Sequence, residues 1–202
     1  MKTRYLGLAD YHATWTAMRE FTDKRTVDDT DELWVCEHPA VYTLGQAGRR
    51  EHILNTADIP VVQSDRGGQV TYHGPGQVVI YTLINLRRSN IGVRDMVIRL
   101  ENSVIGLLAE HGIVAAGKRD APGVYVEQAK IAALGLRVRR GCTYHGLAMN
   151  IDADLTPFSG IDPCGYRGLE VTSTQQLGVT VARDKIIEQL VSHVHEQLVD
   201  TQ

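Results

Sequence analysis

Two spacings of apolar residues divide the chain into predicted helices and strands. After Asp10, the side chains of Tyr11, Trp15, Met18 and Phe21 recur every three or four residues, which is typical of an amphipathic helix that the aspartate caps. A longer run with this spacing predicts a helix over residues 93–112, which Gly112 can end in a left-handed conformation. A third helix is expected over residues 184–200.

Short apolar and β-branched segments predict strands between these helices. Residues 77–86, "QVVIYTLINL", are apolar on both faces and are expected at the centre of a sheet. Because the strands occur in groups joined by short turns, with helices between the groups, we expect an α+β fold. Residues 1–202 would then form a single domain with mixed β-sheets flanked by helices. The other predicted strands are residues 33–37, 40–45, 113–116, 123–127, 130–140 and 145–151.

The composition argues against nucleic-acid-binding and membrane-spanning proteins. The 202 residues carry a formal net charge of −3, which is not the basic balance that nucleic-acid binding requires. No stretch approaches the roughly 18 apolar residues of a membrane span, and the N-terminus lacks an apolar signal-peptide core. Three cysteines without a secretory signal indicate free thiols in a reducing compartment. We therefore expect a cytoplasmic protein that binds neither nucleic acid nor membrane.

Four glycines surround His73 in residues 66–81, "RGGQVTYHGPGQVVIY". Phosphate-binding glycine motifs lead into a helix, whereas this segment leads into a predicted strand, so nucleotide binding is not indicated. We interpret the segment as a hairpin-like wall, where missing Cβ atoms let a ligand approach the backbone. His73, at the bend, is either a structural hydrogen-bonding residue or a catalytic one.

The histidines and cysteines do not follow a metal-binding pattern. His38, His73, His111, Cys142 and His145 include no C-x-x-C pair and no H-x-x-x-H pair. We expect no bound metal.

Lys130 opens a predicted strand of small and apolar residues. Strict alternation places its side chain on the face of Ala132 and Leu134, opposite Ala133 and Gly135. An ammonium group on an apolar face is costly unless it is paired or loses its proton. Lys130 therefore either extends into solvent from the strand end or serves a site with room for a slim aliphatic chain.

Cys164 stands between Pro163 and Gly165, in a segment that favours a turn and presents the side chain. Cys36, by contrast, follows three apolar residues and is expected to be a buried core residue. A thiol attacks as its thiolate, and a nearby lysine can lower its pKa and accept its proton. Cys164 and Lys130 are therefore a candidate catalytic dyad.

The chain resembles the lipoyl(octanoyl) transferases in five segments between about residues 37 and 173: "EHPAVYTLGQAG", "RGGQVTYHGPGQ", "GVYV", "KIAALGLRVRRGCTYHGLAMN" and "PCGYRGLEVTS". This resemblance implies the fold of the catalytic domains of lipoate and biotin protein ligases. It also implies transfer of an octanoyl group, without a cofactor, from octanoyl-acyl carrier protein to a lysine of lipoyl domains. Those domains belong to 2-oxoacid dehydrogenase complexes and the glycine-cleavage H protein.

The same resemblance assigns roles to individual residues. Cys164 would be the nucleophile that forms an acyl thioester, and Lys130 would lower its pKa. His145 would lie near the site as an auxiliary residue. The implied substrate-binding residues are Arg66, Gly67, Gly68, Gln69, Val70, Thr71, Tyr72, His73, Ala133, Leu134, Gly135, Gly146, Leu147 and Ala148.

Three other activities stay open. An ATP-dependent lipoate protein ligase on the same fold would use a lysine without a cysteine nucleophile. A non-catalytic module that binds acyl carrier protein would need only an apolar channel. A cysteine hydrolase would use His73 or His145 as its base and would transfer the acyl group to water.

Two further features of the mechanism are expected from the residues. Backbone N–H groups of residues 74–77, or those around Cys164, would stabilise the oxyanion that forms during acyl transfer. Arg137, Arg139 and Arg140 form either a solvated strand end or a contact surface for an acidic protein.

Overall fold

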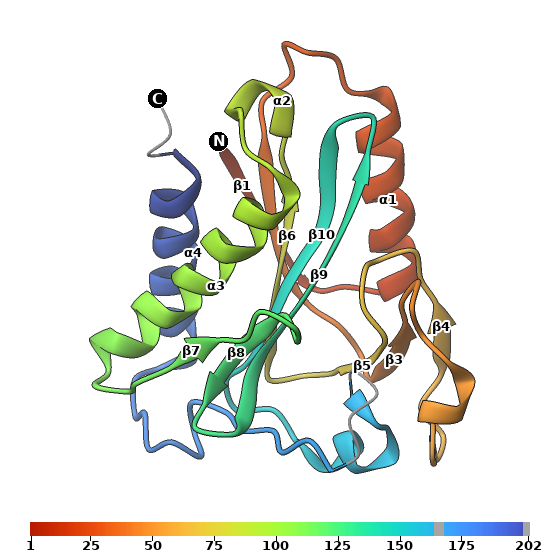
Figure 1. The fold of residues 1–202 in the computed structure, drawn as a ribbon, viewed down its shortest axis with the longest axis vertical. Coiled ribbons are helices and arrows are strands. Elements are labelled where there is room, and N and C mark those ends of the chain that lie inside the picture. Colours follow the sequence, from red (N-terminus) through yellow and green to blue (C-terminus); the bar gives the residue numbers. More distant parts are fainter. Residues whose placement is uncertain (164–167, 200–202) are drawn as a thin grey trace.

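The computed structural model describes residues 1–163 and 168–199 (Figure 1). A seven-stranded sheet in the order β1-β2-β6-β10-β9-β8-β7 and a three-stranded sheet in the order β4-β3-β5 form the centre of this part of the chain. The larger sheet contains β1 (Lys2–Leu8), β2 (Glu32–Glu37), β6 (Gln77–Leu83), β7 (Ala116–Gly117), β8 (Gly123–Val126), β9 (Ala129–Arg139) and β10 (Cys142–Asn150). The smaller sheet contains β3 (Val41–Leu44), β4 (Val61–Gln63) and β5 (Val70–His73).

Both sheets mix parallel and antiparallel pairs. In the larger sheet β1 runs parallel to β2, and the remaining neighbours are antiparallel. In the smaller sheet β3 is parallel to β4 and antiparallel to β5. Strand β6 lies between β2 and β10 and is buried along its whole length, as its two apolar faces predict. The predicted α+β fold with mixed sheets is therefore confirmed.

The three predicted helices are present as α1 (Tyr11–Lys24), α3 (Val93–Glu110) and α4 (Arg183–Val199). Asp10 caps α1, because its carboxylate accepts the backbone N–H of Ala13 at 2.8 Å. Helices α3 and α4 pack together against one face of the larger sheet, and α1 covers the other face (Figure 1). The short helical elements are α2 (Leu86–Ser89), η1 (Arg50–His52) and η2 (Thr156–Gly160).

Alternate residues of β6 divide between the two faces of the larger sheet. Val78 and Ile80 join the main core beneath α3 and α4, whereas Val79 and Tyr81 join a second core with Met18 of α1. The α1 face is shared with the smaller sheet, whose own core includes η2. A pocket lined by residues of both sheets opens on this shared face.

Strand β1 is not predicted by the sequence pattern. Its side chains are mostly exposed because it forms an edge of the sheet, so no apolar alternation marks it. The predicted strand at residues 113–116 is also displaced, since only Ala116–Gly117 pair with β8. None of the described helices is both long enough and apolar enough to cross a bilayer.

The glycine-rich segment forms a wall but not a hairpin. Strand β5 pairs with β3, and β6 belongs to the larger sheet, so the chain changes sheets between residues 74 and 76. A Cβ atom on Gly76 would lie 2.5 Å from Cα of Ala153, and the φ angle of Gly76 is +87°, so a side chain is excluded there. The predicted hairpin pairing is wrong because this close crossing carries β6 into the other sheet.

A β-bulge in β9 corrects the predicted orientation of Lys130. Tyr125 of β8 pairs with Lys130, and the preceding residue of β8 pairs with Ala132, so Ile131 is the extra residue. Paired residues of antiparallel strands share a face. Lys130 therefore lies on the face of Ala133, whereas Ala132 packs into the main core. Strict alternation fails here because the bulge shifts the strand by one residue.

Candidate active site

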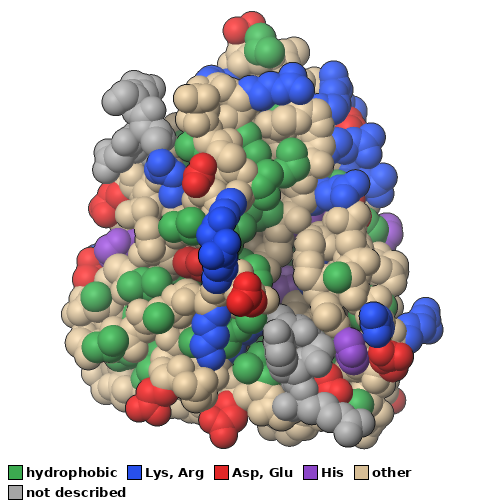
Figure 2. Space-filling view, viewed as in Figure 1, with side chains coloured by type: hydrophobic (Ala, Val, Ile, Leu, Met, Phe, Trp, Pro, Cys, Tyr) green, Lys and Arg blue, Asp and Glu red, His purple; other side chains and the backbone are tan. Residues whose placement is uncertain are grey.

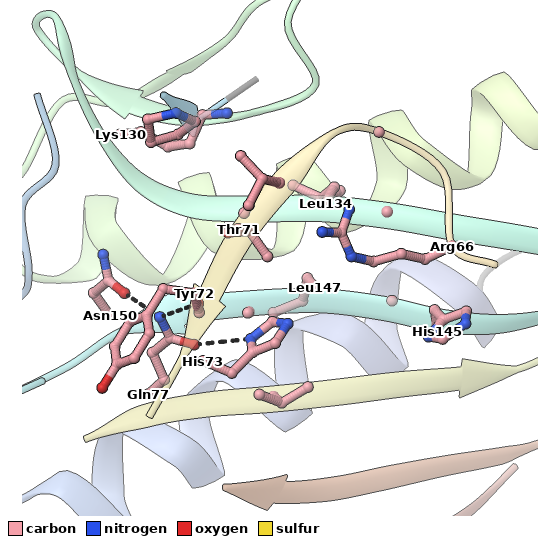
Figure 3. A pocket seen from close by; sticks show the side chains of 18 of the residues that line it. Arg66, Thr71, Tyr72, His73, Gln77, Lys130, Leu134, His145, Leu147 and Asn150 are labelled. Atoms are coloured by element: carbon pink, nitrogen blue, oxygen red, sulfur yellow. Dashed lines mark hydrogen bonds between the residues drawn. The ribbon is translucent and has the colours of Figure 1, made fainter. Parts of the chain in front are cut away.

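A pocket lies between the smaller sheet and the α1-facing side of the larger sheet (Figure 3). It holds about 780 Å³ of space, including its open mouth. Strand β5 and the loop before it form one wall, and β9 and β10 form another. Figure 3 shows Lys130 on one side of the pocket, with Arg66 and His145 on the other. The site therefore extends along β9 from Lys130 to Gly135.

The pocket brings together residues from all three predicted substrate-binding segments. Gly67 does not line it, and its N–H instead donates to the backbone oxygen of Leu136 at 2.9 Å. Cys164 lies outside the described residues. The predicted residues that do line the pocket are Lys130, Arg66, Gly68, Gln69, Val70, Thr71, Tyr72, His73, Ala133, Leu134, Gly135, His145, Gly146, Leu147 and Ala148.

Lys130 is buried, with 5% of its surface exposed. Its N–H donates to the backbone oxygen of Glu170 at 2.8 Å, and its own carbonyl accepts the N–H of Thr172 at 3.0 Å. Its Nζ lies 5.2 Å from the centre of the Tyr125 ring, within the range of a cation–π contact. The alternative in which Lys130 extends into solvent is therefore excluded.

His73 is held in one tautomer by Gln77. The Gln77 amide donates its Nε2 hydrogens to the backbone oxygen of Tyr72 and to Oδ1 of Asn150, so its Oε1 faces Nδ1 of His73 at 3.1 Å. The imidazole must then donate through Nδ1, and Nε2 is left as an acceptor. Burial, with the nearby His38 and Arg66, lowers the pKa of His73 to about 3. His73 is therefore neutral at pH 7.

His145 is held by the carboxylate of Asp65, which no sequence motif marks as part of the site. Nε2 of His145 lies 2.9 Å from Oδ1 of Asp65, which also accepts Trp15 Nε1–H at 2.8 Å, while the other Asp65 oxygen accepts the Tyr144 hydroxyl. Burial alone would raise the pKa of Asp65, but the hydrogen bonds from His145, Tyr144 and Trp15 outweigh it and hold this pKa well below its usual range. Burial lowers the pKa of His145 despite Asp65. The pair is therefore an ionised carboxylate that accepts from a neutral imidazole.

A second buried hydrogen-bonded group lies behind His73. Nδ1 of His38 donates to the backbone oxygen of Ala9 at 2.6 Å, so its Nε2 accepts the Tyr81 hydroxyl at 2.7 Å. Burial lowers the pKa of His38 and raises that of Tyr81 well above its ordinary value. The rings at this end of the pocket are therefore neutral at pH 7.

Cys36 lies beside this group, 3.6 Å from Nε2 of His38. It is 3% exposed, and burial, assisted by Glu37, raises the pKa of its thiol to about 12. The prediction that Cys36 is a buried core residue is confirmed, and its thiol is poorly suited to attack.

Arg66 builds the loop that forms one wall of the pocket. Its guanidinium donates to Oγ1 and the backbone oxygen of Thr43 and to the backbone oxygens of Gly67 and Gln69. These bonds fix the glycine-rich loop against β3. Arg66 therefore holds the loop that forms this wall of the pocket, and its own side chain is fixed by the same bonds.

Residues 74–77 do not supply a pair of amides for an oxyanion. Pro75 has no N–H, the N–H of Gly76 donates to Glu37 at 2.9 Å, and the N–H of Gln77 donates to the backbone oxygen of Gly74 at 3.2 Å. The N–H groups of Gly76 and Gln77 stabilise the crossing between the sheets, so this turn does not offer the pair of donors expected there. The alternative oxyanion site around Cys164 involves residues 164–167, which lie outside the described residues.

Several lining residues are not identifiable from the sequence. Tyr11 and Tyr81 are typical core residues of a helix and a strand, and Phe158 lies in the short helical element η2. Period-two alternation in β6 is the signal that places Val79 and Tyr81 on one face, but it does not show that a pocket lies there. No group of three or more His, Cys, Asp or Glu side chains in the described ranges is arranged to hold a metal ion.

The arginines near the end of β9 lie at the opposite end of the strand from Lys130. Lys and Arg side chains gather at the upper right of the molecule, over α1 and the β9–β10 turn (Figure 2). Arg139 forms an ion pair with Asp23 of α1 at 2.7 Å, and Arg140 donates to the backbone oxygen of the same residue. These contacts join the end of β9 to α1.

The family is decided by comparison with known proteins. The model of the "Lipoyl protein ligase A/B catalytic domain" matches residues 10–195. The chain is 58% identical over 200 residues to an octanoyltransferase of Alkalilimnicola ehrlichii, covering 99% of this chain and 93% of the relative. The chain belongs to the octanoyltransferase family. A second member, from Chromobacterium violaceum, is 54% identical and covers 96% of this chain and 94% of its own.

Solved structures share the fold of this family member at low sequence identity. A putative lipoate protein ligase from T. acidophilum with bound lipoic acid has a TM-score of 0.78 at 17% identity, covering 98% of this chain and 86% of its own. The biotin protein ligase of Aquifex aeolicus with biotin and ATP has a TM-score of 0.62 at 13% identity, covering 98% and 71%. The predicted relation to the catalytic domains of lipoate and biotin protein ligases is confirmed at the level of the fold.

Proposed function

We propose that this octanoyltransferase-family chain transfers an octanoyl group from octanoyl-acyl carrier protein to a lysine of lipoyl domains, in 2-oxoacid dehydrogenase complexes and the glycine-cleavage H protein. The observation that carries the proposal is a buried amine, Lys130, in the wall of a pocket that also has apolar lining. Val79, Leu134, Leu147 and Val171 line the same pocket. These side chains suit an unbranched acyl tail, because burying it removes apolar surface from water.

In the first half-reaction, the neutral form of Lys130 takes the proton from the thiol of Cys164. The thiolate attacks the thioester carbon of the donor, and the carbon–sulfur bond to the carrier breaks. The leaving carrier thiolate takes the proton back from Lys130. The products are an octanoyl thioester on Cys164 and the free carrier thiol.

In the second half-reaction, the acceptor lysine attacks the thioester carbon of the acyl-enzyme. Lys130 removes a proton from the attacking nitrogen and returns it to the sulfur of Cys164 as that sulfur leaves. The products are an octanoyl amide and the free enzyme. The donor is already an activated thioester, so the proposed reaction requires neither ATP nor a cofactor.

The two histidines that line the pocket are weak candidates for the base of a cysteine hydrolase. The pKa of about 3 leaves His73 with little affinity for a proton at pH 7, and burial also lowers the pKa of His145. Lys130 is the better candidate for the base, because its amine is buried beside the proposed acyl-binding walls.

The test combines the purified protein with octanoyl-acyl carrier protein and a lipoyl domain in the absence of ATP. We expect intact-mass spectrometry to detect an octanoyl adduct first on the enzyme and then on the acceptor. Cys164→Ala should abolish both adducts, whereas Cys36→Ala, which removes a buried thiol, should retain them. Labelling of the acceptor only when ATP and free octanoate are present would identify a ligase instead. Release of free octanoate without labelling of the acceptor would identify a hydrolase, and an octanoyl-carrier complex without any transfer would identify a binding module.

A further inference from the structure

Glu101 of α3 is a half-buried carboxylate directed at the strand that pairs with Lys130. Its Oε1 accepts the N–H of Gly123, the first residue of β8, at 2.9 Å. Its other oxygen lies close to β7, since a Cβ atom on Gly117 would be only 2.7 Å from Oε2. The missing side chain of Gly117 thus leaves the space that the carboxylate occupies.

Gly123 also contacts the side chain of Lys130. A Cβ atom on Gly123 would lie 3.0 Å from Cε and 3.4 Å from Nζ of Lys130. The φ angle of Gly123 is +148°, a conformation that other residues rarely adopt. Glu101 and Lys130 therefore contact the same glycine. Glu101 binds the N–H of Gly123, and the side chain of Lys130 lies against its Cα, where another residue would carry a Cβ atom.

The two side chains also interact electrostatically. Burial raises the pKa of Glu101, and the N–H of Gly123 and then the charge of Lys130 act in the opposite direction. This interaction is reciprocal, because an anion that is stabilised by an ammonium group stabilises the ammonium to the same extent.

We propose that Glu101 is a positioning residue for Lys130: it fixes Gly123 beneath the lysine side chain, and its negative charge helps Lys130 to retain a proton. Its catalytic purpose rests on the proposed function. During acyl transfer Lys130 accepts a proton and becomes an ammonium ion, and a nearby carboxylate favours that charged form. The carboxylate acts through Gly123 and through space, without touching the acyl group.

Other charged groups lie on the elements that pack around this pair. Lys118, from the turn before β8, lies 4.1 Å from the centre of the Tyr125 ring and opposes the effect of Glu101 on Lys130. Glu170 contacts Lys130 through its backbone oxygen. On α4, His193 and Glu196 interact with each other, and His193 also binds Glu110 near the far end of α3. The charged residues of α3 itself are Arg94, Asp95, Arg99, Glu101 and Glu110.

The direct test measures the reactivity of the Lys130 amine as a function of pH. Trace labelling with acetic anhydride modifies only the neutral amine, and peptide mass spectrometry reports the labelling of Lys130 separately. Glu101→Gln keeps an oxygen that can accept the Gly123 N–H but removes the charge. We expect its labelling midpoint to lie about one pH unit below that of the wild type, so that Lys130 labels roughly tenfold faster at a pH below both midpoints.

Two further variants separate charge from structure. Glu110→Gln makes the same charge change on the same helix and should leave the midpoint unchanged. Glu101→Asp keeps the charge but shortens the side chain, so it should retain most of the wild-type midpoint even if its turnover falls. An unchanged midpoint in Glu101→Gln, an equal shift in Glu110→Gln, or an equal shift in Glu101→Asp would each overturn the proposal.

The labelling midpoint of Lys130 can be measured whether or not the protein has octanoyltransferase activity. A wild-type protein that transfers no octanoyl group would refute the proposed function, yet the labelling midpoints would still decide whether Glu101 controls Lys130. If transfer is observed, kcat is also measured as a function of pH. The midpoint at which kcat changes with the protonation of Lys130 should move in Glu101→Gln in the same direction as the labelling midpoint. A fall in kcat without a change in this midpoint would indicate that Glu101 has only a structural role.

Discussion

Asp65 and His145 are joined by a hydrogen bond of 2.9 Å between Oδ1 and Nε2, although 80 residues separate them in the chain. The same carboxylate accepts hydrogen bonds from Trp15 and Tyr144. One side chain thus connects α1, the loop before the glycine-rich segment and the strand that forms the floor of the pocket. Because the donors are neutral and the carboxylate is ionised, the arrangement depends on the charge of Asp65.

Asp65→Asn should lower the free energy of unfolding at pH 7 by about 2–3 kcal/mol, because an amide cannot accept three hydrogen bonds as a carboxylate does. The pKa of Asp65 is depressed in the folded protein, so its stabilising contribution is present above the unfolded value of about 3.9 and is lost as the pH falls through the folded value. Urea unfolding at pH 7 and pH 3 checks this. The difference between wild type and variant should shrink at pH 3, and an equal difference at both values would contradict it.

His73→Gln should flatten the acid side of the stability profile. The folded pKa of about 3 lies below the unfolded value near 6.5, so between these values the unfolded chain binds more protons and stability falls as the pH falls. One such group contributes a slope of up to about 1.4 kcal/mol per pH unit. Chemical denaturation from pH 6.5 to pH 4 measures the slope. The slope of the unfolding free energy against pH should be smaller in the variant by about the contribution of one proton. A variant with the wild-type slope would show that His73 does not take up a proton on unfolding.

Lys130→Ala should reduce kcat/KM for octanoyl transfer by about 10²- to 10⁴-fold, the range expected for loss of a positioned proton-transfer group. A loss of less than about tenfold at pH 7 would indicate that Lys130 only increases the thiolate fraction of Cys164. Lys130→Arg should be similarly inactive, because a guanidinium does not release its proton. Steady-state kinetics with octanoyl-acyl carrier protein test all of these variants.

Gly135→Ala should raise KM for the octanoyl donor more than it lowers kcat. The new Cβ atom would lie 2.8 Å from the backbone oxygen of Gly67 and 3.4 Å from Cδ of Arg66, so the loop that forms the pocket wall must move. Overpacking of this kind costs about 1–3 kcal/mol of stability. Kinetics with donors of different chain length, together with thermal unfolding, provide the measurements. An unchanged KM for every donor would show that this contact does not shape the pocket.

Local sequence patterns predicted most of the secondary structure. The helix that follows Asp10 and the buried strand at Gln77–Leu83 appear because their apolar spacing matches a helix or a strand buried on two faces. Strand β1 could not be predicted in this way, since its exposed side chains carry no pattern and its pairing with β2 is made by the backbone. The β-bulge at Ile131 could not be predicted from the sequence either, because it arises from the pairing register of β8 and β9.

Local patterns and motifs in the chain are enough to predict the helices, the central strands, the family resemblance and the segments that line the pocket. The packed fold is needed to show which way Lys130 faces, that residues 66–81 pass between two sheets, and that Asp65 holds His145 and Glu101 approaches Gly123. This difference arises because periodicity and turn chemistry act over a few residues and can be recognised locally. Strand register and contacts between distant side chains are set when the sheets and helices pack together, and nothing local in the chain specifies them.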